Sequence, residues 1–445
     1  AGLLIISGEF DLSIGSMIGF AGGVMAMILR WGFAVVIPYV SFEGGVHMET
    51  YTLFKITDVS PLLAISITLC FTLFFGWLQG FIIVKSGLAS FIVTLGGLFF
   101  LRGLTEVCYR AFNKKPDQTA GSTTVTEIPD IKNIVNVPGH GELERDVAKS
   151  LPQEELLELL KTVPEATVLK LTEKLTYINE KVAASKTLLL KNKGVKGLEK
   201  ALENATASGN EGMVAILQDK IANFKIDPAT AKIVTDVDIA KAYIDTLHSA
   251  RPVANFFGGD IMEPLFDWLY FTVDWNVNNY GNQFADGLYS CLMIWFLLAL
   301  ICYVLLSQTQ AGNWIYSTGG NLNAAKANGV PTNKVKISLF MFSAFCATMF
   351  AACQVFETNT ADTAKGNLKE LEAIAAAVIG GVVLTGGFGT VVGIIVGAAI
   401  FGIAKEAFFY IPGVDGSFYR VFLGIVLLAS ALTNENIRKR VIGSV

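Results

Sequence analysis

Charged residues are scarce in this sequence of 445 residues: they make up 16%, against about 25% in ordinary soluble proteins. Hydrophobic residues make up 52%, and the mean hydropathy is +0.52. The few charges are also unevenly placed, because residues 113–267 hold 19 of the 34 Lys and Arg and 23 of the 38 Asp and Glu. We therefore expect a membrane-embedded body joined to a polar insert of domain size.

Several kinds of site are missing from the sequence. The three histidines, His47, His140 and His248, are scattered among polar residues, so no metal site is expected. None of the six cysteines falls in residues 113–267, which excludes a disulfide framework there, and no pair has zinc-finger spacing. No GxxxxGK[ST], GxSxG or HExxH pattern occurs, so we expect no bound cofactor, no ATPase site and no enzyme activity in this chain. The net charge of −4 arises within the insert and offers no basic surface for nucleic acid.

Eight apolar segments are candidates for crossing a membrane, which takes about 20 apolar residues. They are residues 12–40, 60–84, 88–111, 284–307, 335–356, 368–384, 388–411 and 418–432, of which the sixth and last are short. Residues 1–7 are expected to end a further apolar helix whose beginning is absent. The sequence predicts an all-α integral membrane protein, a polytopic bundle with broken helices. It divides into a membrane part at 1–112, an insert at 113–267 and a membrane part at 268–445.

The side of the membrane on which each loop lies follows from Lys and Arg, which are enriched in short cytoplasmic loops. Residues 308–336 carry three lysines and no acid, and the C-terminal tail carries Arg438, Lys439 and Arg440. Both segments are predicted to be cytoplasmic, which places the insert outside, in the periplasm if the cell has one. Apolar residues three and four apart at 151–160 and 168–190 predict that the insert is mainly helical, with a cap at Ser150 and a break at 208–210.

Glycines interrupt the membrane segments at two places. Gly380-Gly381 and Gly386-Gly387 flank 382–385 and predict a broken helix, while Gly389, Gly393 and Gly397 repeat every four residues, as in close helix packing. Near the start, Asp11 or Ser13 is expected to cap the helix that follows. Irregular backbone at membrane depth is tolerated where it is buried in protein or lines a cavity.

The same segments resemble the permeases of bacterial monosaccharide ABC transporters of the ribose and xylose type, in the superfamily of the branched-chain amino acid permeases. The motifs that carry the resemblance are GEFDLSIGS at 8–16, ASFIVTLG at 89–96 with LRGL at 101–104, GGN at 319–321 with Ala324, Ala325 and Gly329, ELEAIAAAVIGG at 370–381, and TGGFGT at 385–390. Glu9 replaces a glycine of the family pattern, and the insert exceeds the usual short loop. The resemblance implies ten membrane helices, of which two would precede Ala1.

The resemblance also implies partners and site residues. The partners are cytoplasmic ATPase subunits that hydrolyse ATP, a periplasmic sugar-binding protein, and a second permease copy in the bilayer of a bacterial inner membrane. Together with the broken segments, it assigns the substrate pathway to Asp11, Ser13, Gly15, Ser16, Thr94, Gly96, Gly380, Gly381, Thr385 and Gly386. It assigns ATPase coupling to Gly319, Gly320, Asn321, Ala324, Ala325, Lys326 and Gly329, a short helix capped by Asn321 and ended by Gly329.

The expected function is therefore that of an importer permease for a monosaccharide or similar polyol, working by alternating access. Three alternatives remain open. One is a branched-chain amino acid permease of the same superfamily. Another is a secondary carrier or channel that needs no ATP. The last is a sensor or scaffold anchored by the membrane part, although a plain anchor would not need glycine-broken helices.

Overall fold

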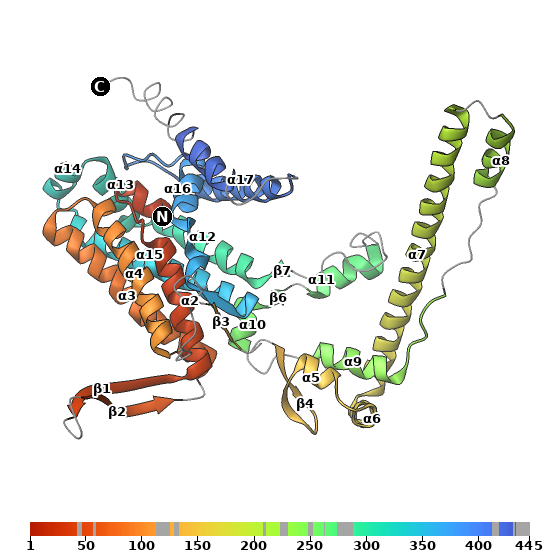
Figure 1. Ribbon diagram of the computed structural model, residues 1–445. Helices are drawn as coiled ribbons and strands as arrows, with labels where there is room; N and C mark the ends of the chain where they lie inside the picture. Colours follow the sequence, from red (N-terminus) through yellow and green to blue (C-terminus); the bar gives the residue numbers. More distant parts are fainter. Residues whose placement is uncertain are drawn as a thin grey trace. The chain divides into compact units, whose positions relative to one another are not determined.

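The computed structural model describes most of the chain (Figure 1). Its described residues exclude 42–46, 57–58, 113–124, 129–132, 208–210, 223–229, 248–251, 262, 274–287, 412–417, 430–431 and 433–445. The predictions for 208–210 and for the basic tail at 438–440 therefore lie outside the described residues. The chain divides into two compact units, one of residues 1–131, 256–259 and 290–445, and one of residues 132–255 and 260–289.

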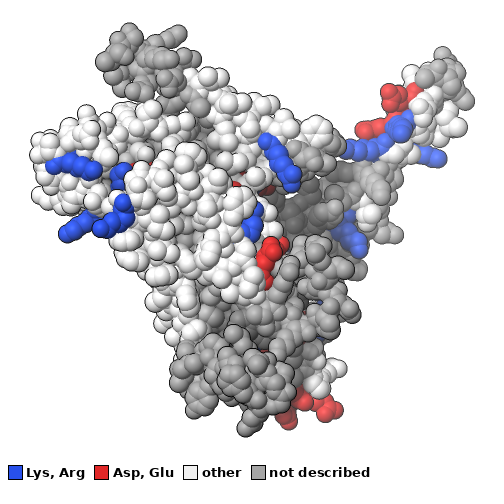
Figure 2. Space-filling model, turned by 60° about the vertical axis from the view of Figure 1, so that its left-hand side comes forward, with Lys and Arg blue, Asp and Glu red and all other residues white. Residues whose placement is uncertain are grey.

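The first unit is a bundle of apolar helices. Among the described residues, six helices are long and apolar enough to cross a membrane: α2 (Ile14–Trp31), α3 (Pro61–Ser86), α4 (Ser90–Phe112), α12 (Ser290–Gln308), α15 (Thr332–Thr358) and α17 (Val391–Phe409). The shorter α16 (Lys369–Ile379) and a helix at Phe418–Ala429 correspond to the two predicted short segments. Figure 2 shows how few charged side chains interrupt the white surface of this unit. The prediction of an all-α membrane protein is confirmed.

Packing between these helices depends on small residues. α15 lies against α3, where a Cβ added to Gly76 would come within 2.8 Å of the Phe340 carbonyl oxygen. α16 and α17 approach equally closely, since a Cβ on Gly393 would lie 2.2 Å from the Gly380 oxygen and one on Gly397 2.3 Å from the Ala376 oxygen. The predicted packing role of Gly393 and Gly397 is confirmed, because neither position has room for a side chain, whereas Gly389 has φ +156° and precedes α17, so it does not share that helix face.

The predicted span at 12–40 is wrong at its C-terminal end. Helix α2 ends at Trp31, and Gly32 with φ +82° turns the chain into β1 (Phe33–Ser41), which pairs antiparallel with β2 (His47–Ile56). The run from Phe33 to Val40 is apolar and rich in β-branched residues and contains Pro38, which favours an extended strand over a helix. Hydropathy alone does not separate these two states.

Short elements complete the first unit. They are α1 (Gly2–Ile6), β3 (Val125–Glu127), α13 (Gln310–Gly320), α14 (Leu322–Ala327), β8 (Thr360–Asp362) and the 3-10 turn η3 (Thr363–Gly366). β3 pairs antiparallel with β8, although 113–124 separate β3 from the membrane helix before it. Figure 1 shows α13 and α14 at the opposite end of the bundle from the β1–β2 hairpin.

The second unit is mainly helical, as the insert was predicted to be, and has a small core of its own. Its elements are β4 (Ile134–Val137), β5 (Gly141–Glu144), α5 (Arg145–Lys149), α6 (Gln153–Thr162), α7 (Glu165–Ala207), α8 (Glu211–Ala222), α9 (Asp236–Thr246), β6 (Asp260–Ile261), α11 (Glu263–Trp268), the π-helix η2 (Leu269–Val273) and β7 (Leu288–Tyr289). Residues of α10 (Pro252–Gly258) fall in both units. Val135, Leu156, Leu159 and Ile244 are buried together.

Long side chains tie η2 and α11 to α7 within the second unit. The Lys181 ammonium lies 4.1 Å from the ring centroid of Tyr270 and donates to the Tyr270 carbonyl at 2.9 Å, and Lys174 pairs with Asp267 at 2.7 Å. The predicted cap at Ser150 is wrong: α6 begins after Pro152, and the Ser150 hydroxyl donates back to the Val147 carbonyl. Pro152 suits the start of a helix, because it has no N–H group there to satisfy.

Candidate translocation and coupling sites

A polar network surrounds the irregular segment between α1 and α2. The Asp11 carboxylate is buried. Its Oδ1 accepts from the Ser13 backbone N–H at 2.9 Å and from the Ser13 hydroxyl at 2.6 Å, and its Oδ2 accepts from the Ser343 hydroxyl at 2.7 Å. The Ser13 Oγ also lies 3.0 Å from the Gln79 amide oxygen. Asp11 therefore connects α2, α3 and α15 through hydroxyl and amide groups.

The backbone of the same segment is held by α4. The Ser90 hydroxyl accepts from the Phe10 N–H at 3.0 Å, and the Thr94 hydroxyl accepts from the Leu12 N–H at 3.1 Å. These contacts satisfy N–H groups that have no helical partner, which is the condition for irregular backbone inside a membrane protein. The predicted cap is wrong in detail. Ser13 is the N-cap of α2, but its side chain makes no capping bond, and its hydroxyl donates to Asp11.

Two further polar side chains lie beside this network. Glu370, in the first turn of α16, is buried, and a Cβ added to Gly15 would lie 2.0 Å from its Oε2 atom. Arg102 of α4 is near enough to interact electrostatically with the Glu370 carboxylate, as is Asp11. Arg102 is the thirteenth residue of the 23 in α4, and Ser343 is the twelfth of the 27 in α15. Arg102 and Ser343 thus lie near the middle of membrane-length helices.

The predicted pathway residues form two groups and one outlier. Asp11, Ser13, Gly15, Ser16 and Thr94 lie in or beside the network around Asp11, and all five are buried. Gly380, Gly381, Thr385 and Gly386 lie in the irregular segment 380–390 between α16 and α17. Gly96 lies on an exposed face of α4 with nothing within 4 Å of an added Cβ. The lining of a substrate pathway by these residues stays a prediction.

Sequence reasoning missed four members of the network, Gln79, Arg102, Ser343 and Glu370. Arg102 and Glu370 stand inside motifs that carry the family resemblance, and a charged residue within an apolar segment is itself a signal of function. Gln79 and Ser343 give no such signal, because single amides and hydroxyls are common in membrane helices. Only the packing of α3 and α15 against α2 brings them to Asp11.

The second irregular segment meets the coupling segment at a junction of backbone atoms. The Gly387 N–H donates to the Ile6 carbonyl at 2.8 Å, and a Cβ on Gly319 would lie 1.9 Å from that carbonyl oxygen and 2.7 Å from the Gly387 nitrogen. Gly386 has φ +84°, and a Cβ there would lie 2.9 Å from both the Gly8 Cα and the Gly319 oxygen. We call Ile6, Gly8, Gly319, Gly386 and Gly387 the glycine junction.

Side chains reinforce the glycine junction on both sides. The Tyr316 hydroxyl of α13 donates to the Gly389 carbonyl at 2.6 Å. Buried Glu9 forms an ion pair with Lys336 in the first turns of α15. α13 and the two irregular segments are therefore joined by direct contacts and cannot move independently without breaking them.

The predicted coupling helix forms as expected. α14 spans Leu322–Ala327, the Asn321 side chain accepts from the N–H groups of Asn323 and Ala324 at 3.1 and 3.0 Å, and Gly329 has φ +76°. The orientation of one residue differs from the expectation: Ala325 is buried within this chain, at 3% exposure, whereas Ala324 and Lys326 are exposed. Any partner of α14 therefore meets Ala324 and Lys326 and does not meet Ala325.

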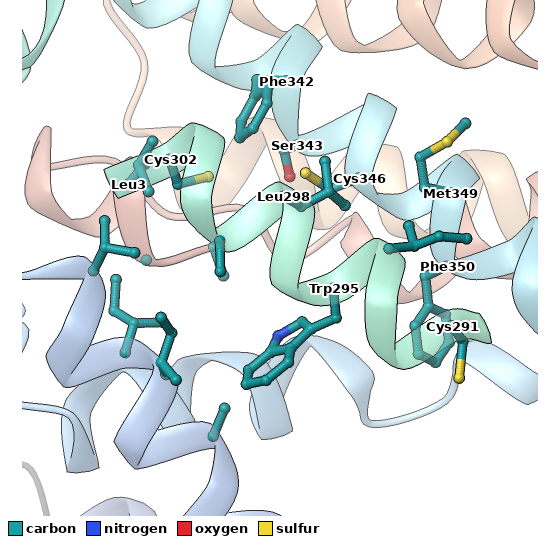
Figure 3. A pocket seen from close by; sticks show the side chains of 18 of the residues that line it. Leu3, Cys291, Trp295, Leu298, Cys302, Phe342, Ser343, Cys346, Met349 and Phe350 are labelled. Atoms are coloured by element: carbon teal, nitrogen blue, oxygen red, sulfur yellow. The ribbon is translucent and has the colours of Figure 1, made fainter. Parts of the chain in front are cut away.

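A pocket of about 570 Å³ lies between α1, α12, α15 and α17. Figure 3 shows Trp295, Leu298, Phe342 and Met349 among its apolar walls, with Ser343 as one of few polar groups. Sugar hydroxyls need hydrogen-bond partners, which this lining offers sparsely. The pocket suits an apolar occupant better than a sugar.

Comparisons with known proteins give a consistent result. The family described as "Branched-chain amino acid transport system / permease component" matches residues 230–431. The Escherichia coli K12 protein named "Ribose import permease protein RbsC" is 26% identical over 274 residues, which cover 58% of this chain and 83% of the relative. The Bacillus subtilis protein of the same name is 32% identical over 162 residues, covering 35% of this chain and 50% of the relative.

A third relative is the E. coli K12 "Galactose/methyl galactoside import permease protein MglC". It is 37% identical over 134 residues, covering 29% of this chain and 39% of the relative. No solved structure matches the chain. All three relatives are named import permease proteins, in agreement with the resemblance seen in the sequence motifs. With six apolar helices of membrane-spanning length among the described residues, the chain is a multi-pass membrane protein, and it is similar to the sugar-type permeases of ABC transporters.

Proposed function

We propose that the chain is the transmembrane subunit of a bacterial importer that carries a monosaccharide or similar polyol into the cytoplasm. The names of the relatives, which refer to ribose and galactose, support this substrate class. The proposed pathway runs beside the broken segments that hold Asp11 and Gly386. Hydroxyl, amide and carboxylate groups of the kind found near Asp11 are those that exchange hydrogen bonds with sugar hydroxyls.

Transport in this proposal occurs by alternating access, driven by ATP hydrolysis in partner subunits. The observation that carries it is the glycine junction. α14 presents exposed Ala324 and Lys326, and α13, directly before it, contacts both broken segments through Gly319. A displacement of α14 by an ATPase would therefore be transmitted to the irregular backbone within the membrane, because backbone atoms in close contact cannot move toward each other.

The remaining partners follow from the proposed orientation. With α14 in the cytoplasm, the second unit lies in the periplasm of an inner-membrane protein, on the side where a sugar-binding protein delivers its ligand. A second permease copy completes the pathway. No cofactor is proposed for this chain, and the ATP is consumed by the partner subunits.

Transport by the purified chain in proteoliposomes, together with its cognate ATPase and binding protein, tests the proposal. We expect uptake of a labelled monosaccharide from a panel that includes ribose and galactose, and no uptake when ATP is replaced by a non-hydrolysable analogue. Uptake of leucine or valine instead of any sugar would make the chain a branched-chain amino acid permease. Sugar uptake that continues without ATP or the ATPase would make it a secondary carrier or channel.

A further inference from the structure

Two buried side-chain atoms lack a hydrogen-bond partner in the part of the chain that the structure describes. They are Nε of Arg102, on α4, and Oε2 of Glu370, on α16. Glu370 is 8% exposed, and the Arg102 guanidinium is one of the groups that act electrostatically on its carboxylate. Opposite charges thus stand near each other without forming an ion pair.

This arrangement is costly in a low-dielectric interior. A buried charge without a partner costs several kcal/mol, whereas pairing with hydrogen bonds recovers much of that cost. Both oxygens of Asp11 already accept hydrogen bonds, Oδ1 from Ser13 and Oδ2 from Ser343, whereas Oε2 of Glu370 accepts none. Arg102 and Glu370 are therefore the natural partners of each other.

The packing around Glu370 places its carboxylate against α2. Its Oε2 lies over Gly15 of α2, where an added Cβ would come within 2.0 Å, and a Cβ on Gly366 would lie 1.8 Å from the Gly15 carbonyl oxygen. The end of η3 and the start of α16 thus pack closely against the start of α2, with the Glu370 side chain against Gly15. α16 also leads directly into the irregular segment 380–390, which ends at the glycine junction.

We propose that Arg102 and Glu370 form an ion pair in a second conformation of the transport cycle, which α16 reaches by shifting away from α2 and toward α4. This inference rests on the proposed transport function. The arrangement in which the two side chains are separate is then one of two positions of α16. Formation of the ion pair stabilises the other position. Movement of the glycine junction would be coupled to this shift of α16, because segment 380–390 follows α16 directly and contains Gly386 and Gly387 of the junction.

The decisive experiment measures the distance between the two positions in each nucleotide state. Arg102→Cys and Glu370→Cys are combined in a chain whose six native cysteines are replaced by Ala, reconstituted with its ATPase. The rate of crosslinking is measured with bifunctional thiosulfonates. Their spacers make up for the length that is lost when the two long side chains become cysteines. We expect the rate to differ at least about fivefold between the nucleotide-free and the ATP-vanadate states. Equal rates in the two states, or no crosslinking in either, overturn the proposal.

A matched control uses Arg102→Cys with Glu372→Cys. The Glu372 carboxylate is two residues further along α16, and it accepts from Tyr419 at 2.7 Å and pairs with Lys405 at 3.3 Å, so it faces other elements. This pair should crosslink slowly in both states. Rapid, nucleotide-dependent crosslinking of the control pair would show that the reagent does not report specifically on the approach of positions 102 and 370. The crosslinking result would then count against the proposed ion pair.

A charge exchange provides a second readout. Arg102→Glu and Glu370→Lys alone should each lower sugar uptake at least about tenfold, because each leaves two like charges close together. The double variant should recover most of the uptake. A double variant that inserts normally but transports no better than the single variants contradicts the pairing. Wild-type uptake is measured in parallel: if the wild type carries no sugar, the proposed function fails, while the crosslinking result still decides on the pairing.

Discussion

At the scale of single residues, the membrane part is organised by polar groups that hold irregular backbone. Asp11 accepts hydrogen bonds from Ser13 and Ser343, and α4 hydroxyls accept from the N–H groups of Phe10 and Leu12. In a hydrocarbon environment, a group of this kind is either partnered or costs several kcal/mol. Each hydrogen bond to the segment before α2 therefore has a larger effect on stability than the same bond at a water-exposed site.

Ser343 allows a direct measurement of this effect. Ser343→Ala removes the donor to Asp11 Oδ2 and leaves a buried carboxylate oxygen unsatisfied, so we expect unfolding in detergent to become easier by about 1–3 kcal/mol. Ser317→Ala is the control, because the exposed Ser317 hydroxyl bonds only its own helix at the Asn313 carbonyl, and its effect should stay within about 0.5 kcal/mol. Equal melting temperatures for the two variants would contradict the role given to Asp11.

How far this site could be predicted differs from residue to residue. Asp11, Ser13 and Thr94 were identifiable because polar residues in an apolar setting within a family motif stand out. Gln79 and Ser343 were not, because their contact with Asp11 depends on the register of α3 and α15 against α2, which no local pattern fixes. Ala325 was placed in the right helix, but its inward orientation follows from how α14 packs on its own chain.

At the scale of elements, glycines decide which segments touch. Gly319 and Gly387 let the end of α13, the end of α1 and the segment 380–390 meet backbone to backbone. The sequence predicted both the broken helix at 380–387 and the coupling helix after 319, because glycine, Asn caps and alanine have strong local preferences. It did not predict that the two elements touch, since that contact spans more than 60 residues.

Gly319→Ala tests whether the glycine junction transmits motion. The added methyl group would lie 1.9 Å from the Ile6 carbonyl oxygen and must separate the segments. We expect sugar uptake to fall at least about tenfold while the ATPase stays bound and active, because the contact surface of α14 is untouched. Gly103→Ala, on an exposed face of α4 where nothing lies within 4 Å of an added Cβ, is the matched control and should transport normally. Normal uptake by both variants would exclude the glycine junction as the route by which motion of α13 and α14 reaches the membrane segments.

The two alanines of α14 give opposite predictions. Ala324→Trp places an indole on the exposed face and should release or uncouple the ATPase while the permease stays folded. Ala325→Trp places it in a site that is 3% exposed and should lower the stability of the permease itself, because a filled site has no room for the larger side chain. Retention of a fully active ATPase by the Ala324 variant would rule out this face as the coupling surface.

The start of α9 in the second unit predicts a pH dependence. Hydrogen bonds from Lys232 and Thr235 lower the pKa of Asp238 to about 2, and Thr235 and Asp238 form a reciprocal capping box. A lowered folded-state pKa means that the stabilisation is present above the ordinary pKa near 4 and is lost as the pH falls toward 2. Asp238→Asn should therefore speed hydrogen exchange in α9 about fivefold at pH 7, and progressively less below pH 4.

Asp236→Asn serves as the control for that measurement. Asp236 lies in the same first turn and carries the same charge, but the capping box uses Asp238. Comparing the two variants at each pH separates the hydrogen bonds of the box from the general attraction of a helix start for negative charge. An equal increase in exchange for both variants would attribute the effect to charge alone.

At the scale of the whole molecule, the chain joins a membrane bundle to a second unit that has its own core. Charge density predicted this division because a bilayer excludes charged residues and water does not. Composition did not predict that β3, at Val125–Glu127, pairs with β8 of the membrane unit, since three residues in a polar stretch carry no apolar signal. The strand β1 was not predicted either, because its sequence is as apolar as that of a membrane helix.

This division defines how the second unit can be removed. Residues 132–255 and 260–289 are replaced by two flexible linkers, which keeps β3 and residues 256–259 with the membrane unit. If the second unit extends the surface that receives the binding protein, stimulation of the ATPase by that protein should weaken severalfold, with basal ATPase activity unchanged. A longer deletion from 125 also removes the strand that pairs with β8 and should lower stability as well. Unchanged stimulation of the shorter variant at every binding-protein concentration would show that docking does not involve the second unit.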